Sequence, residues 1–146
     1  MGTWAAGPFD NDAAADWCAD LDEASPERRP RLVELALREA VREGDFLDSW
    51  PGAKAVAASA VVAAHLPGGP PVDSAYAPDF LTAGGRLTLS AELPALALRA
   101  LDRVLADGSE LAELWEEAGE LDEFAAALAP IRAALANPTG AVVVGG

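Results

Sequence analysis

The stretch PGAKAVAASAVVAAHL, residues 51–66, decides the fold of this chain. A helix drawn through it carries alanine, valine and serine on nearly every side, and a helix that is apolar all round is a buried one. Small side chains also let neighbouring helices approach closely. We therefore expect a central helix over residues 51–66, capped by Asp48 or Ser49, with the other helices packed around it.

Amphipathic segments flank this stretch on both sides. Apolar residues recur at helical spacing in residues 13–22, 30–43, 90–106, 109–118 and 120–136. Asp12 is the expected N-cap of the first helix, Asp79 that of a short turn over 80–82, and Pro94 fits in a first turn. Gly119 either separates the last two segments or lies within one bent helix. We predict an all-α fold, a single compact bundle of five to six helices.

The length of 146 residues corresponds to one domain with a sizeable core. We expect a single helical domain over residues 1–136, with a docked N-terminal loop (1–11) and a Gly/Pro-rich connection (67–89). Residues 137–146 form a C-terminal tail, in which 141–144 are either a short strand or disordered. No secretory signal is visible, and the apolar run 55–66 is about half the length of a membrane span. We expect a cytoplasmic protein that does not bind membranes.

The formal net charge of −14 is unevenly distributed. Acidic residues exceed basic ones by 12 to 5 in residues 1–50 and by 9 to 2 in residues 101–146, whereas residues 51–100 are neutral. We expect no binding to nucleic acid, because contacts with phosphate need clusters of Lys and Arg. An acidic surface attracts a basic protein instead. The candidate surface is a stripe of acidic residues at helical spacing, although such a stripe is most often only the solvated face of a helix. Its residues are Glu110, Glu113, Glu117 and Glu120.

Other reactive residues have structural explanations. Asp10, Asp12 and Asp16 are weak candidates for a metal site, but an EF-hand reading fails because Ala14, Ala15 and Leu21 stand where ligands and glycine are needed. His65, the only histidine, lies where positive charge suits the last carbonyls of a helix. Cys18, the only cysteine, lies on an apolar stripe and is expected to be inert. We assign no catalytic residue and no cofactor.

The N-terminal block carries a family resemblance. Met1-Gly-Thr-Trp4, then Gly7-Pro-Phe-Asp-Asn-Asp12 and Ala15-Asp-Trp17, resembles the opening of the bacterial domain-of-unknown-function family 4259 (DUF4259). The segment Trp115-Glu-Glu-Ala-Gly119 is similar to a later stretch of that family, whereas Ala5 replaces a glycine of its pattern. The resemblance implies a small bacterial helical protein and no established activity. On physical grounds we expect Trp4 and Phe9 to anchor the N-terminal loop on the core.

Charge, size and the bacterial context favour a non-enzymatic, acidic protein-binding module. Its specific version is an immunity or antitoxin-like protein that neutralises a basic toxin. The alternatives are an enzyme, metal-dependent or otherwise, that uses the N-terminal aspartates, and a structural homo-oligomer.

Overall fold

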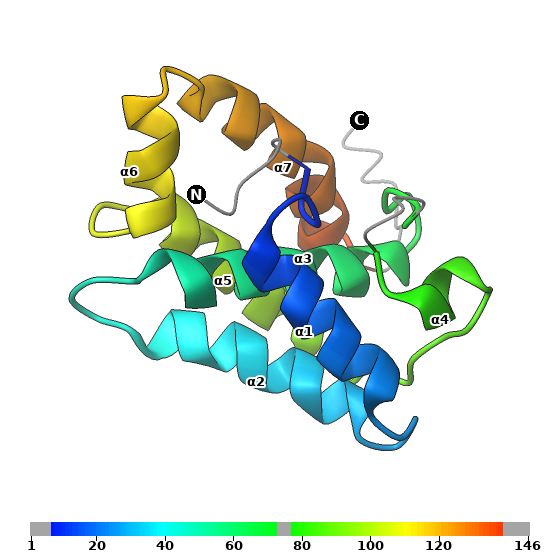
Figure 1. Cartoon of the computed structure of the whole chain (residues 1–146). Coiled ribbons are helices and arrows are strands. Elements are labelled where there is room, and N and C mark those ends of the chain that lie inside the picture. Colours follow the sequence, from blue (N-terminus) through cyan, green and yellow to red (C-terminus); the bar gives the residue numbers. More distant parts are fainter. Residues whose placement is uncertain (1–6, 73–76, 139–146) are drawn as a thin grey trace, which may run out of the picture.

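A computed structural model describes residues 7–72 and 77–138 (Figure 1). Within these residues the chain is all-helical, with seven helices and no strand, so the predicted fold class is confirmed. The helix beyond the five to six expected is the four-residue α4. The helices are α1 Asp12–Glu23, α2 Arg29–Arg42, α3 Ser49–Ala64, α4 Asp79–Thr82, α5 Leu93–Leu105, α6 Glu110–Glu117 and α7 Leu121–Ala136.

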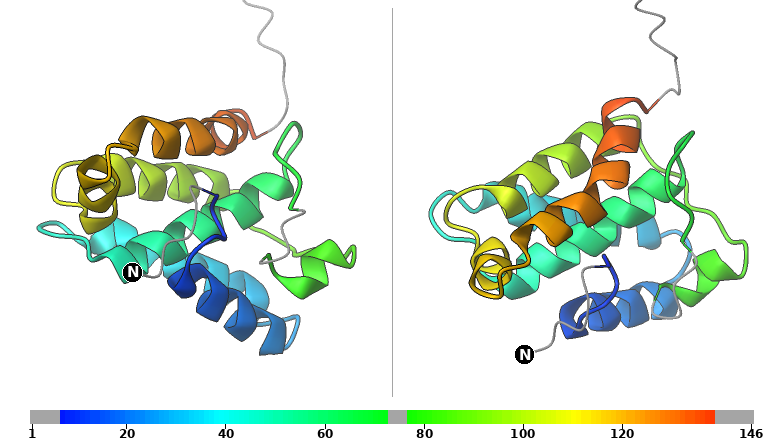
Figure 2. Two further views of the ribbon diagram at one scale, coloured as in Figure 1. Left: turned by 45° about the horizontal axis from the view of Figure 1, so that its top comes forward. Right: turned by 90° about the horizontal axis from the view of Figure 1, so that it is seen from above.

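Helix α3 has neighbours on all sides, as expected for residues 51–66. It packs against α1, α2, α5, α6 and α7 (Figure 2). Ala55, Ala57, Ala58, Val61 and Val62 are fully buried, and their small volume leaves room for the surrounding helices. The hydroxyl of Ser59 donates to the carbonyl of Ala97 on α5 at 3.4 Å, so the one polar side chain buried in α3 is satisfied.

Two of the expected N-caps, Asp12 and Asp79, are instead the first residues of their helices. Asn11, not Asp12, is the N-cap of α1, because its extended backbone (φ −159°) lets the side chain accept the N–H of Ala14 at 2.7 Å. Asp12 is the first residue of α1 itself. Asp79 likewise is the first residue of α4 and not its cap.

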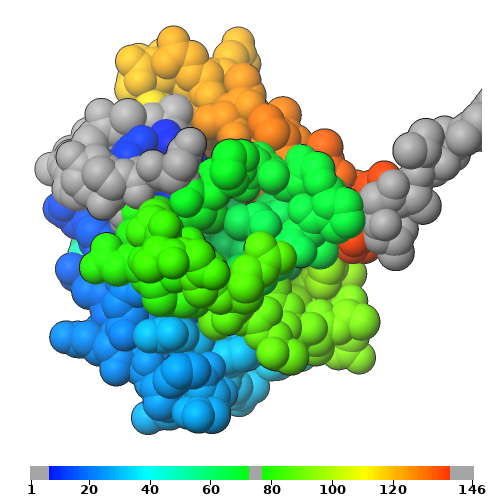
Figure 3. Space-filling model, turned by 90° about the vertical axis from the view of Figure 1, so that its right-hand side faces the viewer, coloured from blue at the N-terminus to red at the C-terminus, as the bar shows by residue number. Residues whose placement is uncertain are grey.

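The start of α4 is held from another helix. The carboxylate of Asp22 accepts the backbone N–H groups of Asp79 and Phe80 at 2.9 and 3.1 Å. The guanidinium of Arg29 donates to the carbonyls of Leu21 and Asp22 and lies 4.1 Å from the centre of the Phe80 ring. Helix α4 thus contacts α1, and Figure 3 shows this face of the molecule.

Gly119 separates α6 from α7, which resolves the open alternative. Its φ of +73° is left-handed and ends α6. The rings of Trp115 and Phe124 then stack at 5.4 Å with an interplanar angle of 7°, and the N–H of Glu120 donates to the carbonyl of Trp115 at 2.9 Å. The corner between the two helices is therefore fixed by packing as well as by backbone.

The α2–α3 and α5–α6 connections lie side by side. Leu47 donates to the carbonyl of Gly108 at 2.7 Å and accepts from the N–H of Glu110 at 2.8 Å, which makes an isolated parallel bridge between Leu47 and Ser109. The guanidinium of Arg103 donates to the carbonyls of Glu43 and Gly108 at 2.7 and 3.2 Å. These bonds hold two loops, 60 residues apart in sequence, in one position.

Phe9 is buried, but Trp4 and the rest of residues 1–6 lie outside the described residues, so docking of the whole N-terminal loop stays a prediction. The expected strand or tail at 141–144 also lies outside them. No helix in the described ranges is both long and apolar enough to cross a bilayer.

The packing around α3 predicts that Ala58→Leu destabilises the protein by about 1–3 kcal/mol, because an overpacked core must shift its side chains or backbone. Ala133→Leu is the matched control, since Ala133 is exposed on α7 and the change there is expected to stay within about 0.5 kcal/mol. Urea unfolding measures both. Equal midpoints for the two variants would contradict the central position of α3.

The cap of α1 predicts that Asn11→Ala lowers the free energy of unfolding by about 1 kcal/mol, whereas Asn11→Asp retains the cap. Urea unfolding at pH 7 compares the two. A loss of equal size in both variants would show that the bond to Ala14 contributes nothing.

Candidate functional site

Three carboxylates of the predicted acidic stripe are exposed. Glu113 and Glu117 lie on α6 and Glu120 lies at the junction with α7. They face solvent because the opposite side of α6, with Leu111, Ala112 and Trp115, is buried. None of the three forms an ion pair with a basic side chain in the described part of the chain. Glu113, Glu117 and Glu120 thus carry uncompensated negative charge where α6 meets α7, and we call these three residues the acidic corner.

Glu110, the fourth residue of the stripe, has a different environment. Its Oε1 accepts the backbone N–H of Ser49 at 2.7 Å, across 61 residues of sequence. The N-terminal N–H groups of a helix need such acceptors, and Asp48, the N-cap by position, makes no side-chain bond. Glu110 therefore joins α6 to the start of α3, and its carboxylate is engaged within the protein.

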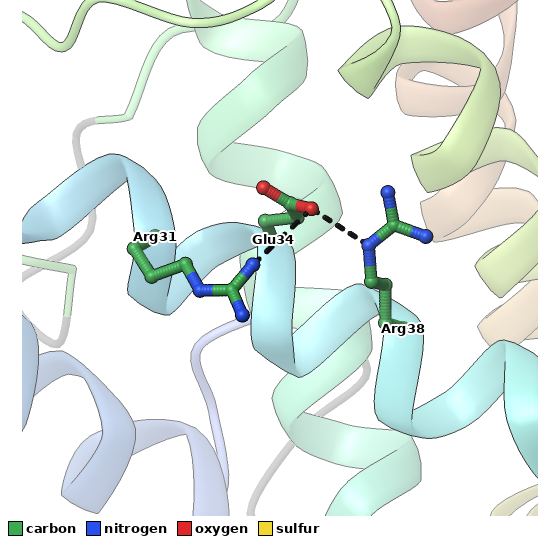
Figure 4. Close-up of polar contacts among 3 residues, drawn as sticks. All are labelled: Arg31, Glu34 and Arg38. Atoms are coloured by element: carbon green, nitrogen blue, oxygen red, sulfur yellow. Dashed lines mark hydrogen bonds and ion pairs between the residues drawn. The ribbon is translucent and has the colours of Figure 1, made fainter.

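Two of the four arginines of α2, in contrast, lie beside a carboxylate. Glu34 Oε2 accepts from Nε of Arg38 at 2.7 Å and lies 3.4 Å from a terminal nitrogen of Arg31 (Figure 4). The hydrogen bond from Arg38 keeps the pKa of Glu34 below its usual value. Two arginines thus share one carboxylate, while the carboxylates of α6 form no ion pair with any cation in the ranges that the structure describes.

The N-terminal aspartates are placed as parts of a turn and a helix start. Asp10 donates its N–H to the carbonyl of Gly7 at 3.1 Å, and Asp12 and Asp16 are exposed on α1. No group of three or more His, Cys, Asp or Glu side chains in the described ranges is arranged to hold a metal ion, so Asp10, Asp12 and Asp16 are not brought together into one.

Cys18 is buried on α1, as expected from its apolar stripe. Desolvation by burial raises the pKa of its thiol to about 12, and the nearby charges of Asp22 and Asp79 act in the same direction. A thiol with so high a pKa is protonated at neutral pH and is a poor nucleophile.

His65 links the end of α3 to the segment after α4. Its Nδ1 lies 2.8 Å from the carbonyl of Val61, and its Nε2 accepts the N–H of Leu87 at 3.0 Å. Only the neutral ring protonated at Nδ1 satisfies both partners. Burial lowers the pKa of His65, and the charge of Arg86 lowers it further, against the opposing bond to Val61. The expectation that positive charge explains its place was therefore wrong: the neutral ring joins two segments.

A hollow of about 410 Å³ adjoins this histidine, between Leu66, Leu87 and Pro94. Because both ring nitrogens of His65 are engaged, neither is available as a general base there. His65 therefore supplies no catalytic group to this hollow.

Two surface aromatics were not singled out from the sequence. Phe46 is 43% exposed and Trp50 is 48% exposed, at the end of the α2–α3 connection and in the first turn of α3. Hydrophobic periodicity could not reveal them, because Phe46 lies in a connection without a helical period and Trp50 precedes the run of small apolar residues in α3. The available signal was local: two large aromatics alternate with acidic residues in the sequence DFLDSW, residues 45–50.

The two bonds of His65 predict a pH dependence of stability. Because the folded pKa lies below that of the unfolded chain, about 6.5, the neutral ring stabilises the fold fully above pH 6.5. That contribution is lost as the pH falls through the folded pKa, when a proton on Nε2 would face the N–H of Leu87. We expect the wild type to lose more free energy of unfolding than His65→Gln between pH 7.5 and pH 5.

Urea unfolding of both proteins at each pH measures the difference, and the variant controls for titration of the carboxylates. The single histidine also gives one imidazole Hε1 resonance, whose titration reports the pKa directly. A folded pKa at or above 6.5 would contradict the prediction.

The comparison with known families gives one result. No curated protein and no solved structure matches the chain. The model of the family described as a domain of unknown function (DUF4259) matches residues 2–127. That range contains helices α1 to α6 and the first part of α7, and the chain therefore belongs to the DUF4259 family.

Proposed function

We propose that the protein is a non-enzymatic, acidic binding module of the bacterial cytoplasm whose partner is a basic protein. The observation that carries the proposal is the set of exposed carboxylates of Glu113, Glu117 and Glu120, which form no ion pair within the described residues. They stand on a corner fixed by the Trp115–Phe124 stack and by Gly119. Because the backbone of this corner is already ordered, binding there loses little affinity to backbone entropy.

The net charge of −14 supports the choice of a basic protein. A surface field of this sign speeds association with cationic proteins and opposes association with nucleic acid. The specific version that we propose is an immunity or antitoxin-like protein, in which the acidic corner covers the cationic surface of a toxin. Residue Glu110 supports the corner from within, through its bond to Ser49.

The proposal predicts that the triple variant Glu113→Lys, Glu117→Lys, Glu120→Lys loses its basic partner. Affinity capture from bacterial lysate with elution by a salt gradient measures this, because ion pairs at a surface weaken as salt rises. We expect the wild type to retain a basic protein, and we expect this protein to elute from the wild type at a higher salt concentration than from the variant.

The charge-matched control is Asp20→Lys, Glu23→Lys, Glu27→Lys, which changes three exposed acids on and after α1. It shifts the net charge equally but leaves α6 intact. Elution at the same salt concentration from the triple variant and the wild type would refute the acidic corner as the interface. If both triple variants bind the partner equally weakly, the effect comes from net charge alone and not from the position of the carboxylates.

A further inference from the structure

Two of the three large hydrophobic side chains that are strongly exposed in the described residues lie in one short stretch. Phe46 and Trp50 are four positions apart, at 43% and 48% exposure, whereas Leu35 lies on α2, about two turns before that helix ends. Exposed aromatics cost apolar hydration, and Trp is enriched among the residues that dominate binding energy at interfaces. The two aromatics therefore lie close together in the chain, and both are of the kind that binding interfaces bury.

The backbone beneath the pair is held rigidly. Leu47, between the two aromatics, is fully buried and bridges to Ser109 through bonds to Gly108 and Glu110. The N–H of Ser49 is held by Glu110. Gly108 passes so close to the other loop that a Cβ there would lie 2.7 Å from the carbonyl of Asp45. The two aromatics thus project from a fixed platform.

The platform is strongly acidic. Residues 43–50 and 107–113, which the bridge brings together, contain six carboxylates and no Lys or Arg. The guanidinium of the neighbouring Arg103 is directed to backbone carbonyls of these loops. The carboxylates are Glu43, Asp45, Asp48, Asp107, Glu110 and Glu113.

We propose that Phe46 and Trp50 form the docking site for a partner segment that presents Arg or Lys next to an apolar side chain. The apolar side chain covers the aromatic surface, and a guanidinium or ammonium group lies over an aromatic face or among the surrounding carboxylates. This inference rests on the proposed function, since it extends the acidic corner of α6 through Glu113 and names the apolar part of the interface.

Charge complementarity excludes the competing occupants. In a symmetric dimer across this patch, the six carboxylates of one copy would meet those of the other, and like charges in an interface are costly. An anionic membrane or a nucleic acid would meet the same repulsion. A cationic protein segment satisfies both the aromatic surface and its acidic border.

The test uses three labelled synthetic peptides of equal length, with fluorescence anisotropy as the readout. The first alternates arginine with leucine across Gly-Ser spacers, the second replaces leucine with serine, and the third replaces arginine with glutamate. We expect the wild-type protein to bind the first peptide tightest, the second at least 10-fold more weakly, and the third not at all. Phe46→Ala and Trp50→Ala should each weaken the first peptide by about 10-fold.

Leu35→Ala is the matched control, because it removes a similarly exposed apolar side chain from α2 and should leave the affinity unchanged. Urea unfolding shows whether each variant keeps wild-type stability. Sedimentation equilibrium of wild type and Trp50→Ala tests the dimer, and a dimer that Trp50→Ala dissociates would overturn the proposal in favour of a second copy as occupant.

The outcomes separate this inference from the proposed function. Unchanged affinity in Phe46→Ala and Trp50→Ala overturns the inference, and the proposed function still stands if the Glu113/Glu117/Glu120 triple lysine variant weakens the first peptide. If the aromatic variants weaken binding and the triple variant does not, the aromatic site stands and the acidic corner fails. Equal binding of the glutamate peptide overturns the requirement for a cation.

Discussion

From Ala55 to Ala63, helix α3 must be covered on every side, because this part has no polar face to turn toward water. Apart from Ser59, its fully buried positions are alanines and valines, so it contributes little volume to the core and depends on close approach of its neighbours. Helices α1, α2, α5, α6 and α7 all supply that cover. The larger side chains that fill the remaining space, such as Leu37, Leu101 and Leu128, come from these surrounding helices. The arrangement of the whole domain follows from one helix that cannot lie at a surface.

The two ends of α3 are held by residues distant in sequence. At its start, the N–H of Ser49 is held by Glu110 from α6. At its end, His65 accepts the N–H of Leu87 from the segment after α4. A helix so weakly polar has few side chains of its own to bind free backbone groups, and Asp48 makes no cap bond. At its start, a helix that buries α3 therefore also satisfies one of its free N–H groups, whereas the bond at its end joins α3 to a later segment.

The contrast between local patterns and bonds from distant residues explains what could be predicted from the sequence. The helices followed from apolar spacing, and Pro94 marked a first turn because proline restricts the backbone locally. Gly119 was compatible with a break or a bend, and the structure shows the break. The hydrogen bonds that distant residues make to helix starts did not follow. The bonds from Glu110 to Ser49 and from Asp22 to Asp79 span 61 and 57 residues, and no local pattern reveals which carboxylate will lie beside which helix end.

The candidate site was predictable to the same extent. The helical spacing of Glu113 and Glu117 was sufficient to place both on the solvated side of α6, but Glu110 could not be told apart from them by spacing alone. The exposed faces of Phe46 and Trp50 depend on the bridge between Leu47 and Ser109, a contact between two connections. Surface exposure in a connection is a property of the tertiary fold, so periodicity carries no information on it.

The acidic surface carries far more negative charge than the cations of the protein can match. Arg31 and Arg38 share Glu34, Lys54 pairs with Glu39, and Arg132 pairs with Asp102. The other carboxylates in the described ranges form no ion pair, and Glu113, Glu117 and Glu120 are one group of these. Uncompensated charge on a surface that is rigid beneath it raises the energy of the free protein by self-repulsion. A cationic partner relieves that repulsion, which gives the bound state an advantage that a matched surface would not have.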